Sequence, residues 1–197
     1  MRAASTYSAN AIDVVLIGAS AGGVEALGAI LPQLPSAFRP ALVAVMHLPP
    51  DRPSLLPEIF GPRCAIPVKE AEDKEPIAAG TIYFAPPGYH LQIESDRTFV
   101  LSADDPVQFS RPSIDVLFET ASWVLGSSAL GILLTGANAD GARGIQALHR
   151  AGAATWIQDP RTAMVTTMPE AALSLTPSSE VMTLAQIAAR LTEMKEG

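Results

Sequence analysis

The sequence predicts an α/β fold: a doubly wound, mainly parallel sheet flanked by helices, with an appended antiparallel β-hairpin. Short apolar runs alternate with helix-length segments, which is the pattern of a parallel sheet wrapped by helices. Several of these runs are continuously apolar, as expected of strands that are buried on both faces. Proline pairs at 49–50 and 86–87 follow strand-like runs. Stiff loops suit the carboxyl ends of the strands, where open α/β sheets bind their ligands.

Strands and helices are expected in alternation along most of the chain. The apolar runs predict strands at Val14–Gly18, Ala41–His47, Ile66–Glu70, Thr81–Ala85, Gly131–Thr135 and Ala154–Gln158. The helix-length segments are Val24–Leu34, Ser54–Phe60, Ile114–Leu125, Ala142–Arg150 and Leu184–Lys195. Two short runs, His90–Glu94 and Thr98–Ser102, are separated only by polar turn residues and predict the hairpin.

Length and composition indicate one globular domain over residues 1–197, with residues 1–11 expected to be flexible. The 197 residues are 48% hydrophobic and 17% charged, which is typical of a chain that can bury its own core. The net charge is −7, and no cluster of lysine and arginine occurs. The composition therefore argues against a nucleic-acid partner and against an anionic membrane surface.

The cysteine count and the N-terminal region favour the cytoplasm. Cys64 is the single cysteine, so an internal disulfide is excluded and a reducing compartment is expected. The apolar run Val14–Gly18 is too short to cross a bilayer. A signal peptide would need a basic start and a longer apolar stretch, but Arg2 is alone and Asp13 interrupts the segment.

Ser20 is the candidate nucleophile. It lies between Gly18 and Gly22, directly after a predicted strand and before a predicted helix, as the G-x-S-x-G nucleophile elbow requires. The elbow predicts a sharp turn with a strained serine backbone, and N–H groups at the following helix start could hold an oxyanion. Two alternatives are a plain helix-capping turn and a phosphate-binding turn, although the G-x-G-x-x-G and Walker lysine patterns are missing.

His47 is the candidate base among three histidines. It ends the strand-like run Ala41–His47, so a parallel sheet would place it at the same edge as Ser20, one strand away. A histidine that ends an apolar strand can also be a plain rim residue. His90, at the start of the hairpin, is the second choice, and the position of His149 near a helix end is explained by a dipole contact.

Asp140 is the candidate acid that orients the histidine. It follows the predicted strand Gly131–Thr135 and a loop of small residues, which would let a buried carboxylate reach the histidine Nδ1–H. Asp140 could instead cap the following helix. Asp159 precedes a proline and suits a turn, and Asp115 suits the first turn of a helix. The chain has no H-E-x-x-H pattern, no cysteine pair and only three histidines, so no metal site is expected.

The chain resembles the chemotaxis protein-glutamate methylesterases, of the CheB type, over nearly its whole length. Six blocks carry the resemblance in order: Ile17–Gly23, Met46–Pro49, Ile82–Leu91, Arg111–Phe118, Leu134–Ala142 and Gln158–Ala172. The resemblance implies a parallel α/β sheet and a cytoplasmic serine hydrolase. It implies hydrolysis of glutamyl methyl esters on the cytoplasmic helices of chemoreceptors to glutamate and methanol, and deamidation of certain receptor glutamines. The family's usual N-terminal receiver domain has no counterpart among these residues.

The resemblance gives the roles of nucleophile, base and orienting acid to Ser20, His47 and Asp140, with no cofactor. In the expected mechanism His47 Nε2 takes the serine proton, and the backbone N–H groups near Ala21 and Ala137 hold the oxyanion. The chain departs from the family pattern at Ala21, Met46 and the segment 137–138. Two alternatives therefore stay open: the same mechanism on a different ester or amide, and a non-catalytic module that binds the receptor.

Overall fold

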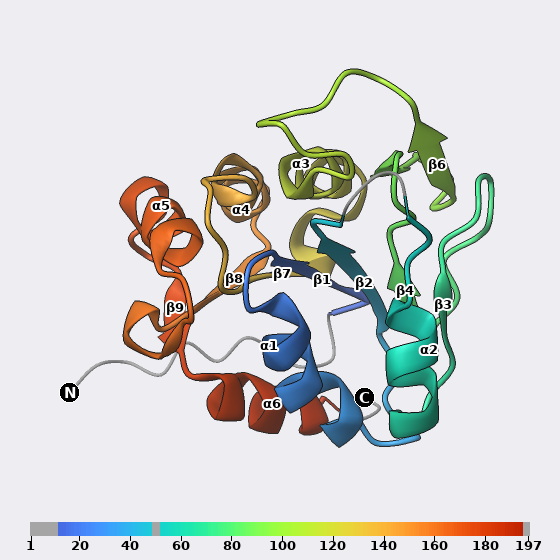
Figure 1. Cartoon of the computed structure of the whole chain (residues 1–197), viewed down its shortest axis with the longest axis horizontal. Coiled ribbons are helices and arrows are strands. Elements are labelled where there is room, and N and C mark those ends of the chain that lie inside the picture. Colours follow the sequence, from blue (N-terminus) through green and yellow to red (C-terminus); the bar gives the residue numbers. More distant parts are fainter. Residues whose placement is uncertain (1–11, 49–51, 195–197) are drawn as a thin grey trace.

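The computed structural model describes residues 12–48 and 52–194, and it contains a seven-stranded parallel sheet (Figure 1). The strand order across the sheet is β3-β4-β2-β1-β7-β8-β9. The strands are β1 Val14–Ala19, β2 Ala41–Met46, β3 Val68–Glu70, β4 Ile82–Phe84, β7 Ala129–Leu133, β8 Ala154–Gln158 and β9 Glu180–Met182. The expected flexibility of residues 1–11 and the proline pair 49–50 lie outside the described residues.

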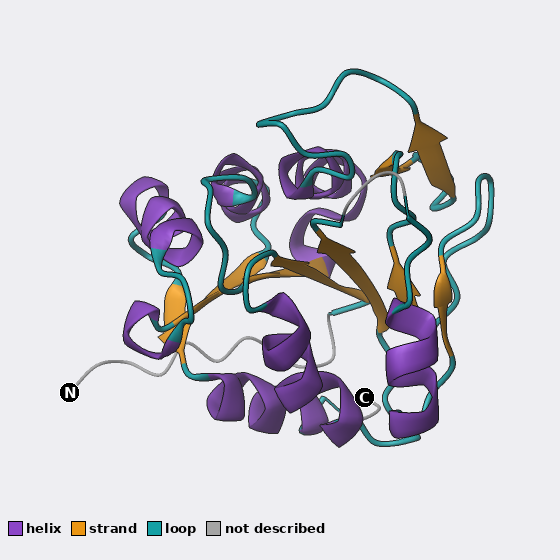
Figure 2. Ribbon diagram, viewed as in Figure 1, coloured by secondary structure: helices purple, strands orange, loops and turns teal. Residues whose placement is uncertain are grey.

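Helices cover both faces of the sheet, so the doubly wound α/β prediction is confirmed. The helices are α1 Gly23–Ile30, α2 Leu56–Phe60, α3 Ile114–Leu125, α4 Ala142–Arg150, α5 Thr167–Leu175 and α6 Leu184–Thr192. Figure 2 shows α1, α2 and α6 below the sheet and α3, α4 and α5 above it. None of the helices within the described residues is long and apolar enough to cross a membrane.

The alternation of side chains along β1 divides the core into two layers. Val15 and Ile17 pack into a cluster that includes Leu27 of α1 and Leu191 of α6. Val14 and Leu16 point to the other face, where the cluster includes side chains of α3, α4 and α5. Both sets are buried, which explains why the strand has a continuously apolar sequence.

The predicted hairpin is present as a two-stranded antiparallel sheet of its own. β5 His90–Ile93 pairs with β6 Phe99–Ser102, and Ile93 lies opposite Phe99. Leu91, Ile93 and Phe99 are buried in the same cluster as the apolar face of α3. The hairpin therefore covers one end of the upper core layer.

Among the described residues, one strand and one α-helix were not predicted. β9 has only three residues at the edge of the sheet, too few to show a periodicity. α5 contains Pro169 near its start, where the missing N–H costs no helical hydrogen bond. The predicted helix Val24–Leu34 is divided into α1 and the 3₁₀ helix η2 Leu31–Gln33, because Pro32 cannot donate a hydrogen bond inside a helix.

The order of the strands creates a crevice next to β1. From β1 the chain moves to β2 on one side and later to β7 on the other, so this is a topological switch point. Ligands of open α/β sheets bind at such points, outside the carboxyl ends of the strands. In register, Ala19 pairs with Met46, and Gly18 pairs with Leu133. The segments that carry Ser20, His47 and Asp140 therefore leave the sheet at one edge.

Candidate active site

Ser20 begins the turn between β1 and α1, as the sequence predicted. Its N–H donates to the carbonyl of Thr135 at 3.0 Å, which fixes the turn to the segment that follows β7. The left-handed residue is Gly22, at φ 79°, and a Cβ there would lie 2.8 Å from Cβ of Met164. Ser20 is not among the residues with positive φ. The prediction of a strained serine backbone is therefore wrong, because Gly22 adopts the left-handed conformation that the sharp turn requires.

His47 lies between Ser20 and Asp140. Its backbone N–H donates to the carbonyl of Ala19 at 3.3 Å, so the β1–β2 pairing continues to the histidine. Its Nδ1 is 3.1 Å from Ser20 Oγ, and its Nε2 is 2.7 Å from Asp140 Oδ2. The side chain is 13% exposed, so one part of the ring reaches the crevice.

The two ring nitrogens have the opposite roles to those expected from the sequence. Nδ1, near the histidine backbone, meets the serine on the adjacent strand. Nε2, at the far end of the ring, reaches past β1 to the aspartate that follows β7. An ionised Asp140 accepts the Nε2–H and leaves the Nδ1 lone pair toward Ser20 Oγ. The assignment of Nε2 as the basic nitrogen is therefore wrong, although the contacting residues are those predicted.

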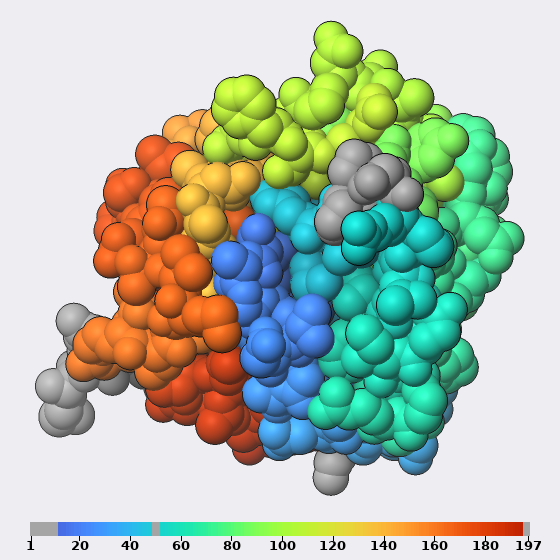
Figure 3. Space-filling view, in the orientation of Figure 1, coloured from blue at the N-terminus to red at the C-terminus, as the bar shows by residue number. Residues whose placement is uncertain are grey.

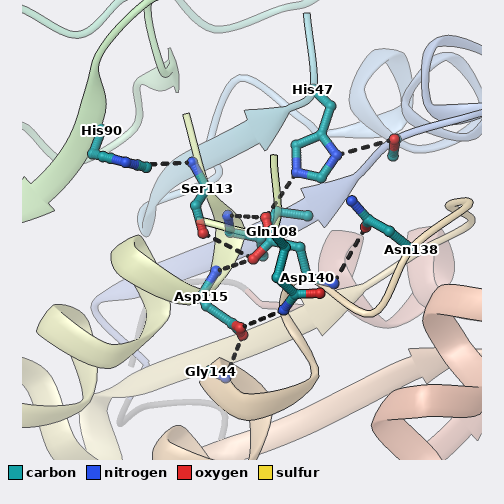
Figure 4. Close-up of polar contacts among 10 residues, drawn as sticks. His47, His90, Gln108, Ser113, Asp115, Asn138, Asp140 and Gly144 are labelled. Carbon is teal, nitrogen blue, oxygen red and sulfur yellow. Dashed lines mark hydrogen bonds and ion pairs between the residues drawn. The ribbon is translucent and has the colours of Figure 1, made fainter. Parts of the chain in front are cut away.

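Asp140 is fully buried at the N-terminus of α3 (Figure 4). Its Oδ1 accepts from Ser113 Oγ at 2.8 Å and from the Asp115 N–H at 3.0 Å. Its Oδ2 accepts from the Ile114 N–H at 2.7 Å in addition to His47. The alternative in which Asp140 caps its own following helix does not hold, because the N-cap of α4 is Gly141.

These contacts decide the ionisation of Asp140. Burial by itself raises the pKa of a carboxyl group. The hydrogen bonds from His47, from the N–H groups of Asp115 and Ile114, and from Ser113 outweigh burial and lower the pKa of Asp140 below its ordinary value. Asp140 is therefore a fixed negative charge beneath the imidazole.

Asp115 is a second buried carboxyl group in the same region, in the first turn of α3 as predicted. It accepts from the Gly144 N–H at 2.7 Å and from Gln108 Nε2 at 3.2 Å. Burial, together with the negative charges of Asp140 and Glu119, raises the pKa of Asp115 to about 6. Asp115 thus contacts the starts of α3 and α4 but not the candidate base.

The other candidates have structural contacts. His90, the second choice for the base, is buried, with Nε2 3.1 Å from the carbonyl of Asp105 and Nδ1 accepting from the Ser113 N–H. His149 lies in the last turn of α4, where its Nε2 is 3.0 Å from Ser178 Oγ. Asp159 accepts from the Arg161 backbone and guanidinium, which confirms its assignment to a turn.

Two supporting residues were not singled out from the sequence. Ser113 donates to Asp140, and Thr135 Oγ1 donates to the carbonyl of Ala21 at 2.8 Å. The Val165 N–H donates to Thr135 Oγ1 at 2.9 Å, so one hydroxyl connects the serine turn to the loop before α5. A position directly before a predicted helix was the available signal for Ser113, and the end of a predicted strand was the signal for Thr135.

The expected oxyanion donors remain available. Ala137 is exposed and Ala21 is partly exposed. Within residues 12–48 and 52–194, the N–H groups of Ala21 and Ala137 donate to no other group. Across the same ranges, no cluster of three or more histidine, cysteine, aspartate or glutamate side chains could hold a metal ion.

Two depressions adjoin the candidate site, one beside His47 and the other beside Gly22 of the serine turn. One, of about 260 Å³, is lined by His47, Leu48, Pro106, Phe109, Ser110 and Arg111. The other, of about 400 Å³, includes Gly22, Thr135, Arg161 and Met164 in its lining. In Figure 3 the blue surface of the first turn and helix lies in a hollow between the yellow-green segment above and the orange segment on the left. His47 and the serine turn therefore each border a depression of the surface.

Comparisons with known proteins show which family the chain belongs to. The family model described as CheB methylesterase matches residues 15–191. A putative protein-glutamate methylesterase/protein-glutamine glutaminase of Leptospira interrogans is 46% identical over 176 residues, covering 89% of this chain and 91% of the relative. The corresponding enzyme of Bordetella parapertussis is 40% identical over 182 residues, covering 90% of this chain and 52% of the relative, so the chain spans about half of that protein.

A solved structure gives the same result for the fold. The crystal structure of the Thermotoga maritima CheB methylesterase catalytic domain superposes with a TM-score of 0.88 at 30% sequence identity. The match covers 93% of this chain and 98% of the Thermotoga chain. The chain belongs to the CheB methylesterase family.

Proposed function

We propose that this chain is a protein-glutamate methylesterase in which Ser20 is the nucleophile, His47 is the base and Asp140 orients the base. The observation that carries the proposal is the continuous contact from Ser20 Oγ through both ring nitrogens of His47 to the buried Asp140 carboxylate, at 3.1 and 2.7 Å. Nucleophile, base and orienting acid within hydrogen-bond reach are the signature of nucleophilic catalysis.

The reaction proceeds through an acyl-enzyme. His47 Nδ1 takes the proton of Ser20 Oγ while Oγ bonds to the ester carbonyl carbon. The oxygen that becomes negative is stabilised by the free N–H groups of Ala21 and Ala137. When the tetrahedral intermediate collapses, the bond to the methoxy group breaks, and methanol leaves with the proton from His47.

Water completes the cycle. A water molecule gives its proton to His47 Nδ1 and attacks the acyl carbon, and the bond to Ser20 Oγ breaks as the serine regains its proton. The products are a glutamate side chain and the free enzyme. Asp140 stays ionised throughout and stabilises the imidazolium ion in each half of the reaction, which its lowered pKa supports.

The proposed substrate is a methylated glutamate on the cytoplasmic helices of a chemoreceptor, with no nucleic-acid partner, no membrane insertion and no cofactor. The names of the Leptospira and Bordetella relatives support this substrate, and they also support deamidation of glutamine. Deamidation uses the same steps, except that ammonia leaves in place of methanol. The single cysteine and the family membership support a cytoplasmic location for the enzyme.

The test is methanol release from a methylated cytoplasmic receptor fragment by wild type and by Ser20→Ala. Wild type should release methanol, and Ser20→Ala should be inactive while remaining folded, because the change removes one hydroxyl from a turn. Ser178→Ala is the matched control: its hydroxyl also contacts a histidine, His149, but the other ring nitrogen faces the Thr155 hydroxyl and no carboxylate. Methanol release by a folded Ser20→Ala protein would refute the proposal. A wild type that cleaves only small esters would point to a different ester substrate.

A further inference from the structure

Residues 106–111 border the depression that His47 lines, and they contain a tight two-residue turn. The backbones of Val107 and Ser110 exchange two hydrogen bonds, at 3.1 and 2.9 Å. Between them, Gln108 and Phe109 have φ values of 49° and 65°. This pair of left-handed residues normally favours glycine or asparagine, so a glutamine and a phenylalanine raise the free energy of the backbone there.

Contacts on both sides hold this turn in place. Gln108 Nε2 donates to the buried carboxyl of Asp115 at 3.2 Å. Arg111 Nη1 donates to the carbonyls of Ala103 and Asp104 at 2.8 and 2.9 Å. On the other side of the segment, His90 Nε2 is within 3.1 Å of the carbonyl of Asp105. The turn is thus fixed to the same helix terminus that holds Asp140 (Figure 4).

The result of this arrangement is an aromatic ring held in water beside the candidate base. Phe109 is 103% exposed, and it lines the same depression as His47 and Leu48. A fully exposed ring gains nothing from folding, and the left-handed backbone adds a cost. Strain that is maintained by surrounding contacts at the edge of a site indicates a role in function.

We propose that Phe109 determines substrate specificity by packing against an apolar side chain of the protein substrate, next to the esterified glutamate. The inference rests on the proposed function. The charges favour an apolar contact: Asp104 and Asp105 are exposed beside the turn, the whole chain carries −7, and Arg111 is engaged with backbone carbonyls. An anionic partner would be repelled here, whereas Leu48 and Pro106 extend the apolar lining.

The test compares two substrates. One is a methylated cytoplasmic fragment of a chemoreceptor, and the other is the γ-methyl ester of N-acetylglutamate methylamide, which presents the ester without neighbouring residues. Phe109→Ala is measured beside Phe109→Leu, which keeps an apolar side chain. Trp123→Ala is the matched control, because Trp123 is an equally unpartnered aromatic, 80% exposed, near the C-terminal end of α3.

Phe109→Ala should lower kcat/KM for the receptor fragment by about 10-fold or more, which corresponds to about 1.4 kcal/mol, mainly through a higher KM. Its loss on the small ester should be far smaller. Phe109→Leu should recover most of the receptor activity, and Trp123→Ala should match wild type on both substrates. Equal losses on the two substrates, or an unchanged KM for the receptor, would overturn the role of Phe109. A wild type that releases no methanol from the receptor would instead overturn the proposed function, and this inference with it.

Discussion

The carboxylate of Asp140 has two kinds of partner, and they predict two consequences of changing it. One partner is the imidazole of His47, whose tautomer the carboxylate fixes. The others are the first N–H groups of α3 and the Ser113 hydroxyl, which need an acceptor because they are buried. Asp140 therefore contacts the proposed base and caps α3 at the same time.

Asp140→Asn should lower kcat by about 10⁴-fold, as expected when the acid of a serine hydrolase triad becomes an amide. The amide NH₂ replaces one acceptor, so the variant should also lose about 1–3 kcal/mol of unfolding free energy. Methanol release and chemical denaturation measure the two effects. Asp159→Asn is the control, since the Asp159 carboxylate is paired with Arg161 in a turn. If Asp159→Asn lost more activity than Asp140→Asn, the assignment of Asp140 as the orienting acid would be wrong.

The raised pKa of Asp115 should make the stability of the folded protein depend on pH. Its pKa is raised from 3.8 to about 6 by burial, so between these values the folded protein holds a proton that the unfolded chain has lost. The stabilising contribution is complete below the unfolded pKa and is lost as the pH rises through about 6. Asparagine keeps an acceptor for the Gly144 N–H but cannot ionise. The unfolding free energy of Asp115→Asn should therefore rise relative to that of wild type, by on the order of 1 kcal/mol as the pH increases from about 5 to 7.5. A difference in unfolding free energy that is constant across this range would contradict the account.

At the scale of elements, the position of the serine turn depends on Thr135, which follows β7 on the other side of β1 from His47. The Thr135 carbonyl accepts from the Ser20 N–H, and the Thr135 hydroxyl connects Ala21 with Val165. The turn, the end of β7 and the loop before α5 therefore form one connected unit. The geometry of this unit sets the position of Ser20, the proposed nucleophile, relative to His47.

Thr135→Val keeps the shape of the side chain and removes the hydroxyl, leaving the Ala21 carbonyl and the Val165 N–H without their partner. The serine turn should shift, and kcat should fall by about 10- to 100-fold because the nucleophile is misplaced. Thr155→Val is the matched control, because the Thr155 hydroxyl is also buried but bonds Ser179. Both variants should lose about 1–3 kcal/mol of stability, and only Thr135→Val should lose activity. Equal activity in the two variants would show that Thr135 is purely structural.

The elements differ in how well local sequence predicts them. The predicted limits of α3 and α4 agree with the observed helices, because apolar periodicity and capping residues mark their ends. β9 could not be predicted, because an edge strand of three residues is stabilised by pairing with β8 and not by its own pattern. The same limit applies to Ser113, since its hydroxyl matters only after α3 has packed against the loop that carries Asp140.

At the scale of the whole molecule, the parallel sheet assembles the site from three distant segments. Parallel strands have their carboxyl ends at one edge of the sheet, and this rule was enough to predict that Ser20, His47 and Asp140 lie close together. The rule was not enough to predict which ring nitrogen of His47 contacts Ser20 and which contacts Asp140. These contacts depend on the strand order β2-β1-β7. The left-handed Gly22 and the Phe109 turn also depend on contacts from other parts of the chain.

In the proposed mechanism His47 activates Ser20 for covalent catalysis. The direct measurement is mass spectrometry of the peptides after treatment with a fluorophosphonate, in wild type and in His47→Ala. We expect a single adduct on Ser20 in wild type, strongly reduced in His47→Ala, and no adduct on Ser178 beside His149. An adduct on another residue, or labelling of Ser20 that does not depend on His47, would contradict the account.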